Sequence, residues 1–298
     1  SGHTGSVIRW QYSTDSGSTW NDIDNTSDTY TATDLTDTTQ FRAVVQSGVC
    51  PEAFSSAATI TVDPAPVPGD VTGGTNVCTG TNSTLLTLSG YTGSVIRWQY
   101  STDSGSTWND IDNTSDTYTA TDLTDTTQFR AVVQSGVCPE AFSSAATITV
   151  DPVTVPGDVT GGTNVCTGTN STLLTLSGYT GSVIRWQYST DSGSTWNDID
   201  NTSDTYTATD LTDTTQFRAV VQSGVCPEAF SSAATITVDP VTVPGDVTGG
   251  TNVCTGTNST LLTLSGHTGS VIRWQYSTDS GSTWNDIDNT SDTYTATD

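Results

Sequence analysis

The chain repeats itself every 88 residues. Trp10 recurs as Trp98, Trp186 and Trp274, each time within the same run, Ser-Val-Ile-Arg-Trp-Gln-Tyr. Near identity over a fixed period is typical of an array of small structural units, each of which contacts its neighbours. A catalytic site needs only one copy, so this repetition favours a structural or multivalent role and argues against an enzyme.

The period divides the chain into two whole repeats between two partial ones. We expect the domain boundaries to give 1–65, 66–153, 154–241 and 242–298, the first lacking its N-terminal strands and the last its C-terminal strands. Because the first 34 residues are identical to the last 34, we also expect the chain to be part of a longer array.

The charge of the chain limits its partners. The net charge is −25, and all seven basic residues are Arg. Nucleic-acid phosphates and anionic membranes are both bound through clustered Lys and Arg, so neither partner is expected. No apolar run is long enough to span a bilayer. Each repeat has the length of one small β domain.

The repeat contains several short stretches of alternating apolar and polar residues. In 94–101, Ile96, Trp98 and Tyr100 are predicted to face one way, and Val95, Arg97 and Gln99 the other. Further short strands are expected at 85–88, 107–111, 117–123, 128–135 and 145–150, with turn residues between them. The pattern predicts an all-β fold of tandem antiparallel β-sandwiches, joined head to tail by an extended linker over 151–158.

Two local motifs resemble known β structures. Leu123-Thr-Asp-Thr-Thr-Gln-Phe129 resembles the corner before strand F of immunoglobulin-like and fibronectin-like sandwiches, with Phe in place of the usual Tyr. Residues 101–108 match the Asp-box hairpin of sialidases and other β proteins. There Asp103 should accept turn N–H groups, Gly105 should take a positive φ, and Trp108 should pack back on the core. With two Arg per repeat, a sialidase-like site is not expected, and we interpret the box as structural.

Each repeat carries two cysteines: Cys50 and Cys78, Cys138 and Cys166, Cys226 and Cys254. Without a CxxC motif or a nearby His, they favour disulfides in an oxidising compartment over a zinc site. Pairing Cys78 with Cys138 would stay inside one domain and contribute about 4 kcal/mol in the chain-entropy model. An immunoglobulin-type topology would instead place these two at opposite ends, so that a bond joins domains as Cys50–Cys78 or Cys78–Cys226. Free buried thiols are the remaining alternative.

The remaining candidates are charged side chains. Arg97 and Arg130, like Arg185 and Arg218 one repeat later, are expected close together on one outer face. They either meet local Asp partners or form a lateral contact with acidic loops of another copy. Asp110, Asp112 and Asp116 are weak candidates for Ca²⁺ but do not fit the EF-hand pattern, and turn formation is the favoured interpretation. No other cofactor is expected.

The whole repeat resembles a known kind of surface protein. It contains Val-Cys-Thr-Gly, then Leu-Thr-Leu-Ser-Gly, the Asp-box and Gly-Val-Cys-Pro in that order. This pattern is similar to the Ig-like tandem repeats of giant type IX-secreted adhesins in gliding Bacteroidota, grappling-hook filament proteins among them. The resemblance implies a secreted, load-bearing, self-associating filament or cell-surface adhesin, bundled with copies of itself for attachment or prey capture. The alternative is an array of modules that bind surface glycans or a prey cell surface by avidity.

Overall fold

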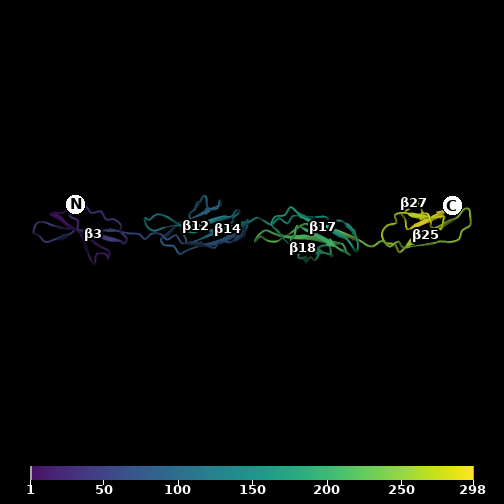
Figure 1. The fold of residues 1–298 in the computed structure, drawn as a ribbon, viewed down its shortest axis with the longest axis horizontal. Coiled ribbons are helices and arrows are strands. Elements are labelled where there is room, and N and C mark those ends of the chain that lie inside the picture. The colour runs from purple at the N-terminus through teal and green to yellow at the C-terminus, as the bar shows by residue number, and fades with distance from the viewer. Residues whose placement is uncertain (1, 298) are drawn as a thin grey trace. The chain divides into compact units, whose positions relative to one another are not determined.

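The computed structural model describes residues 2–297, which form strands and turns without a helix (Figure 1). The expected all-β class is therefore confirmed. The chain divides into two compact units, Ser1–Asp151 and Pro152–Asp298, each with one complete sandwich and one partial set of strands. Within the described part of the chain, no helix is long and apolar enough to cross a membrane.

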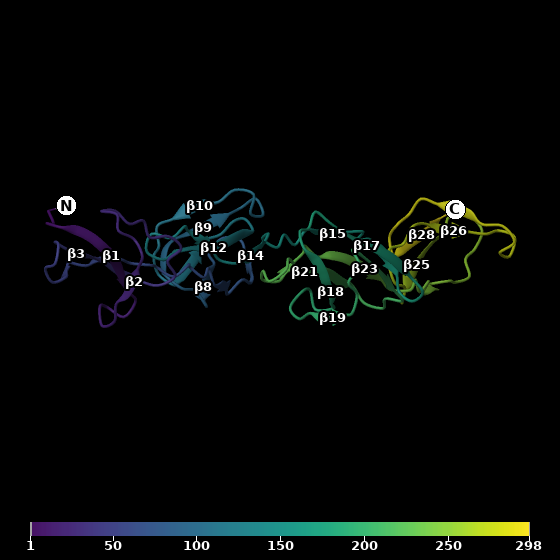
Figure 2. The same cartoon turned by 60° about the vertical axis from the view of Figure 1, so that its left-hand side comes forward.

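The complete sandwich of the first unit has two sheets (Figure 2). One has the order β11-β8-β6, and the other has the order β10-β9-β12-β14-β7 with β13 beside β12. All pairings are antiparallel except that of β7 with β14. This is the immunoglobulin-like arrangement, in which strands A, B and E face strands C, F and G. The strands are β6 (Asp70–Thr72), β7 (Asn76–Cys78), β8 (Ser83–Ser89), β9 (Ser94–Ser101), β10 (Asn109–Ile111), β11 (Thr117–Thr121), β12 (Thr127–Gln134), β13 (Ala141–Phe142) and β14 (Ala146–Asp151).

A column of three aromatic rings fills the space between the two sheets. Trp98 of β9 is fully buried, and its ring lies 5.8 Å from that of Tyr118, which in turn lies 5.5 Å from Phe129. The indole N–H of Trp98 donates to the carbonyl of Ser115 at 2.8 Å, so the ring leaves no polar atom unsatisfied. Leu86 of β8 closes the same core from the opposite sheet.

The alternation predicted for β9 fails at two positions. Val95, expected on the outer face, is buried in the core with Trp98, whereas Ile96 is only half buried. The register explains the error, because Val132 pairs with Arg97 and Val133 with Val95, so that Ile96 is a bulge residue with no partner. A bulge inserts one extra residue and reverses the facing of every residue on one side of it.

Three short strands were not predicted: β6, β7 and β13. β7 lacks alternation and is held instead by its parallel pairing with β14, where Cys78 lies beside Asp151. The strand expected at 107–111 begins only at Asn109, because the side chain and backbone of Thr107 are bonded to the Asp103 turn. The strand expected at 117–123 ends at Thr121.

The complete sandwich of the second unit repeats this topology and register, including the bulge. Its strands are β15 (Asp158–Thr160), β16 (Asn164–Cys166), β17 (Ser171–Ser177), β18 (Ser182–Ser189), β19 (Asn197–Ile199), β20 (Thr205–Thr209), β21 (Thr215–Gln222), β22 (Ala229–Phe230) and β23 (Ala234–Asp239).

Each unit also contains a partial set of strands. The first unit has a single sheet made of β1 (Ser6–Ser13), β2 (Asn21–Ile23), β3 (Thr39–Gln46), β4 (Ala53–Phe54) and β5 (Ala58–Ile60). The second unit has two small sheets made of β24 (Asp246–Thr248), β25 (Ser259–Ser265), β26 (Trp274–Tyr276), β27 (Asn285–Ile287) and β28 (Thr293–Thr297).

Candidate functional site

The two arginines of the repeat lie side by side on the outer face of β9 and β12, as expected. The register places Arg130 opposite Gln99 and Val132 opposite Arg97, so the side chains of Arg97, Gln99 and Arg130 are neighbours on that face. The side-chain amide of Gln99 bridges the two strands. Its Oε1 accepts from Nε of Arg130 at 2.8 Å, and its Nε2 donates to Asp110 at 2.7 Å.

Carboxylates of the same domain neutralise Arg97. Its guanidinium donates twice to Glu140, at 2.9 and 2.7 Å, and once to Asp110 at 3.0 Å. The bond to Glu140 is the largest cause that raises the pKa of Arg97, and the same bond lowers the pKa of Glu140. Bidentate pairs of this kind fix orientation as well as charge. Of the two interpretations given for Arg97, local acidic partners or a contact with another copy, the first therefore describes its contacts.

Arg130 is held differently, between two aromatic rings. Its guanidinium carbon lies 4.0 Å from the ring centroid of Trp108 and 4.3 Å from that of Phe142. Burial, followed by the nearby charge of Arg97, lowers the pKa of Arg130. No carboxylate among residues 2–297 forms an ion pair with Arg130, so its charge is the one that the domain leaves without a counterion. Arg42 and Arg218 are stacked in the same way.

One residue of this network was not anticipated from the sequence. Glu140 belongs to a set of only three Glu in the chain, one per repeat, among many Asp. Each of them, Glu52, Glu140 and Glu228, makes the same bidentate contact with an arginine of β1, β9 or β18. The longer side chain reaches across from the segment before β4, β13 or β22, which an Asp would not do. The selective use of Glu at this position is the signal that could have identified it.

The Asp-box is a self-contained turn. Asp103 accepts from the backbone N–H of Thr107 at 2.8 Å and from its hydroxyl at 2.6 Å, and Ser101 adds a third bond. These bonds, led by that from the Thr107 hydroxyl, lower the pKa of Asp103 to about 2. Gly105 has φ +85, as expected. The expectation for Trp108 is wrong: its ring packs on Arg130 on the outer face, because β12 presents the guanidinium there.

The three weak calcium candidates do not form a site. Oδ1 of Asp110 accepts from both Arg97 and Gln99. Over the described part of the chain, no group of three or more His, Cys, Asp or Glu side chains could hold a metal ion, which contradicts the weaker of the two interpretations of Asp110, Asp112 and Asp116. Asp110 is used as a partner for arginine instead.

The cysteines differ in state. Cys78 and Cys226 are disulfide-bonded, whereas Cys50, Cys138, Cys166 and Cys254 are free thiols. The favoured pairing of Cys78 with Cys138 is therefore wrong, and so is that of Cys50 with Cys78.

The sandwich explains why the intradomain bond does not form. Cys78 lies beside Asp151 at the last residue of β14, whereas Cys138 follows the opposite end of the antiparallel strand β12. About ten strand residues at roughly 3.3 Å each separate these two ends. The Cα atoms of a disulfide must lie within about 7 Å.

The loop after β12 contacts the linker that leads into its own domain. The backbone N–H of Val137 donates to Asp63 at 3.1 Å, and Sγ of Cys138 lies 3.6 Å from the carbonyl oxygen of Asp63 and 3.7 Å from that of Pro64. A Cβ on Gly136 would overlap the Asp63 carboxylate, so this position requires glycine. The linker is thus docked against the domain that it enters.

The second linker docks through a hydroxyl group. Sγ of Cys226 lies 3.2 Å from the carbonyl oxygen of Pro152. Oγ1 of Thr154, a buried residue, accepts from the N–H of Ser223 at 3.0 Å and donates to the carbonyl of Pro227 at 2.9 Å. The first linker has Pro66 at this position and lacks the hydroxyl, so the substitution between linkers has a structural consequence.

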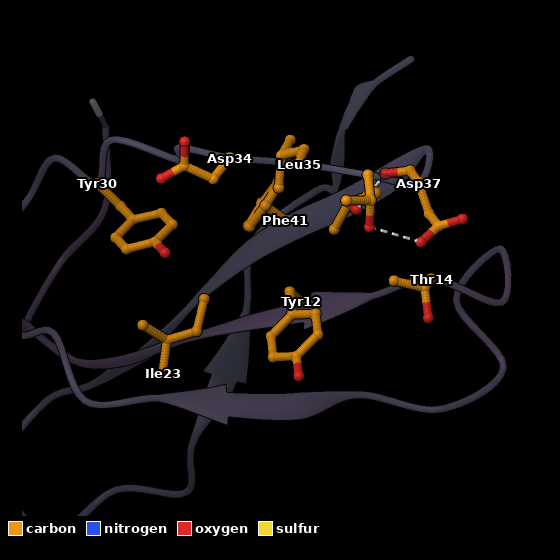
Figure 3. A pocket seen from close by; sticks show the side chains of 10 residues that line it. Tyr12, Thr14, Ile23, Tyr30, Asp34, Leu35, Asp37 and Phe41 are labelled. Atoms are coloured by element: carbon orange, nitrogen blue, oxygen red, sulfur yellow. Dashed lines mark hydrogen bonds between the residues drawn. The ribbon is translucent and has the colours of Figure 1, made fainter. Parts of the chain in front are cut away.

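A shallow hollow recurs in the first three repeats. In the first copy, Tyr30 and Leu35 lie on one side and Tyr12 and Ile23 on the other (Figure 3). The three copies have volumes of about 270 to 290 Å³. Each hollow is lined by one aspartate with φ +54: Asp34, Asp122 or Asp210. Strained backbone conformations of this kind often occur at functional sites.

Comparison with known proteins places the chain in a family. The model of the family described as a domain of unknown function (DUF8696) matches residues 1–64, 67–152, 155–240 and 243–298. No curated protein matches. Among similar solved structures, domains A168–A170 of titin share 16% identity over 80% of this chain and 91% of that one, with a TM-score of 0.38.

Two further structures are similar in the same limited way. Three N-terminal domains of the bacteriophage RB49 outer capsid protein Hoc share 13% identity over 80% of this chain and 89% of that one, with a TM-score of 0.42. The FN1–FN3 domains of chicken CNTN1 share 15% identity over 78% of this chain and 89% of that one, with a TM-score of 0.29. At these values the likeness says nothing about function.

Proposed function

The chain belongs to the DUF8696 family, and we propose that its domains form the load-bearing shaft of an extracellular filament or long cell-surface adhesin. The observation that carries this proposal is the repetition of one closed sandwich with its docked linker. Each copy has the same register, the same buried Trp and the same neutralised Arg. A shaft needs interchangeable units, and the repetition of one sandwich supports this role.

Disulfide chemistry supports a location outside the cytosol. Cys78 and Cys226 are oxidised, and disulfides persist in oxidising compartments. The strongly acidic surface, with a net charge of −25, favours solubility of a long array. These features agree with the secreted, cell-surface role that the resemblance to Bacteroidota adhesins implies.

Lateral association of chains is the second part of the proposal. Arg97 is already paired with Glu140 and Asp110, so it contributes little net charge to a neighbour. The stack of Trp108, Arg130 and Phe142 remains as the cationic and aromatic part of the surface of the repeat. The chain as a whole is strongly acidic. We place the contact with acidic loops of a second copy at this stack.

Electron cryomicroscopy of the native array, sheared from the cell surface, tests both parts. The proposal predicts ordered multi-chain filaments in which density joins the stack of one chain to an acidic loop of the next. Isolated flexible strings would contradict self-association. An array in which Arg42, Arg130 and Arg218 are all changed to Gln should fail to bundle, whereas Thr160→Val, on an exposed strand, should not alter bundling.

The recurrent hollow favours a second function, glycan binding by avidity. Tyr100 is 37% exposed beside it, and threonine hydroxyls and Asp122 line the rim. Aromatic faces with nearby hydroxyl and carboxylate groups suit a single sugar ring. Glycan-array binding by the chain, lost when Tyr12, Tyr100 and Tyr188 are all changed to Ala, would support this function. Equal binding by that variant, or none by either protein, would contradict it.

A further inference from the structure

We propose that the recurrent hollow binds hexosamine units that carry a free, positively charged amino group. The inference rests on the glycan-binding function proposed above and names the class of sugar that the hollow selects. Each hollow is lined by residues of a single repeat, so every copy is a complete site by itself.

One part of the lining is apolar and aromatic. In the second repeat it consists of Ile111, Tyr118, Leu123 and Phe129, together with Tyr100, which is 37% exposed. Ligand sites commonly combine such a lining with a few polar groups that fix the orientation of the ligand. An exposed tyrosine ring over an apolar floor suits the C–H face of one pyranose ring.

The other part of the lining carries two carboxylates. They belong to Asp122 and Asp125 in the second repeat and to Asp34 and Asp37 in the first, where they lie above the ring of Tyr12 in Figure 3. Among the described residues that line the three hollows there is no Lys, Arg or His. Two negative charges without a basic neighbour attract a cation and disfavour an acidic sugar.

The backbone holds the first of these aspartates in an uncommon conformation. Asp122 has φ +54, and Asn82 keeps it there. The backbone carbonyl of Asn82 accepts from the N–H of Asp122 at 2.9 Å, and its Oδ1 accepts from the N–H of Leu123 at 3.0 Å. Within residues 2–297, the carboxylate of Asp122 has no hydrogen-bond or ion-pair partner, so both of its oxygens can accept from a ligand.

The second aspartate is positioned by two threonine hydroxyls. Oδ2 of Asp125 accepts from Oγ1 of Thr124 at 2.9 Å, and its backbone carbonyl accepts from the hydroxyl of the buried Thr127 at 2.7 Å. The first and third repeats have the same bond from threonine to carboxylate, also at 2.9 Å. The ammonium group of a hexosamine has three N–H donors, and this part of the hollow offers carboxylate oxygens to accept them.

The form of the hollow favours a charged sugar over the two simpler ligands. A neutral sugar could use the aromatic part of the lining but would leave both carboxylates without a partner. A lysine side chain could pair with the carboxylates, but it would leave the open apolar part uncovered. The hydroxyls of Thr102 and Thr124, which also line the hollow, can exchange hydrogen bonds with the hydroxyls of a sugar ring.

Calorimetric titration of the intact 298-residue chain with three trimers tests the ligand class. The trimers are β-1,4-linked glucosamine, β-1,4-linked N-acetylglucosamine, which lacks the charge, and trilysine, which lacks the sugar. The titrations should be made near pH 6, where carboxylates are ionised, and at an ionic strength of about 0.15 M. The proposal predicts that the glucosamine trimer binds at least about tenfold more tightly than either of the others, as expected for one charge-assisted hydrogen bond.

Two triple variants locate the effect. The first changes the aspartate with positive φ to Asn in all three hollows, a residue that tolerates this conformation: Asp34→Asn, Asp122→Asn and Asp210→Asn. The control removes the same number of charges from exposed positions that pair with the far end of β8 or its equivalents: Asp70→Asn, Asp158→Asn and Asp246→Asn. The first variant should bind the glucosamine trimer about tenfold more weakly, and the control should bind it like the parent chain.

Each of the other results would overturn the inference. Equal binding of the two sugar trimers, or equal losses in the two triple variants, would contradict selection of a charged amino group and would leave glycan binding in place. Trilysine binding as tightly as the glucosamine trimer would show recognition of charge alone. If no trimer bound, the inference would be wrong, and the glycan array would decide the glycan-binding function separately.

Discussion

The buried tryptophan of each sandwich should dominate its stability. Trp98 and Trp186 are fully buried, contact a second aromatic ring at 5.8 Å and donate one hydrogen bond each. Changing a buried Trp to Ala typically costs about 3 to 5 kcal/mol. A domain of 88 residues has a free energy of unfolding of about 4 to 13 kcal/mol in total. The substitution therefore removes a large share of the stability of each domain.

The matched control is a second tryptophan from the same repeat. Trp108 and Trp196 stack on an arginine at the outer face, where the stack contributes about 0.5 to 1 kcal/mol. The double variants, Trp98→Ala with Trp186→Ala and Trp108→Ala with Trp196→Ala, should be compared by urea unfolding followed by far-ultraviolet circular dichroism. The first should lose at least three times as much free energy of unfolding as the second. Equal losses would refute the assignment of Trp98 to the core and Trp108 to the surface.

Three further predictions follow from other parts of the repeat. Val95→Asp should destabilise the domain far more than Ile96→Asp, because the bulge buries Val95; equal thermal midpoints would contradict the bulge. The lowered pKa of Asp103, about 2 against an unfolded value near 3.8, stabilises the fold above pH 4, and this contribution is lost as the pH falls through 2. Asp103→Asn should therefore flatten acid unfolding between pH 4 and 2, and an unchanged profile would count against the turn. Thr154→Val should cost about 1 to 3 kcal/mol, because Ser223 N–H and Pro227 carbonyl lose their shared partner, whereas Thr160→Val should cost little; equal costs would contradict the docked linker.

Much of the sandwich could be predicted from the sequence because its inward positions alternate. Phe129, Ala131 and Val133 on β12 are buried as the period of two requires, although Val132 between them is buried too. The exact repetition of the pattern also made the outer position of Arg97 and Arg130 predictable. The strand count was less complete, because β7 is held by pairing with β14 and has no pattern of its own.

The errors have physical causes that the residue pattern of a single strand does not display. A bulge such as that at Ile96 depends on how β12 pairs, and alternation alone does not reveal it. Trp108 lies on the outer face because its ring packs on Arg130, which belongs to another strand. The pairing of Cys78 was misjudged because loop entropy favours a bond inside the domain, whereas the geometry of the sandwich separates the two sulfur atoms by its full length.

Pulling a single 298-residue chain by its ends, in the presence of a reducing agent, tests the load-bearing account most directly. The two complete sandwiches have the same register and the same fully buried Trp, so they should unfold in two separate steps at closely similar forces. Extension without steps, or two steps at widely different forces, would contradict the account.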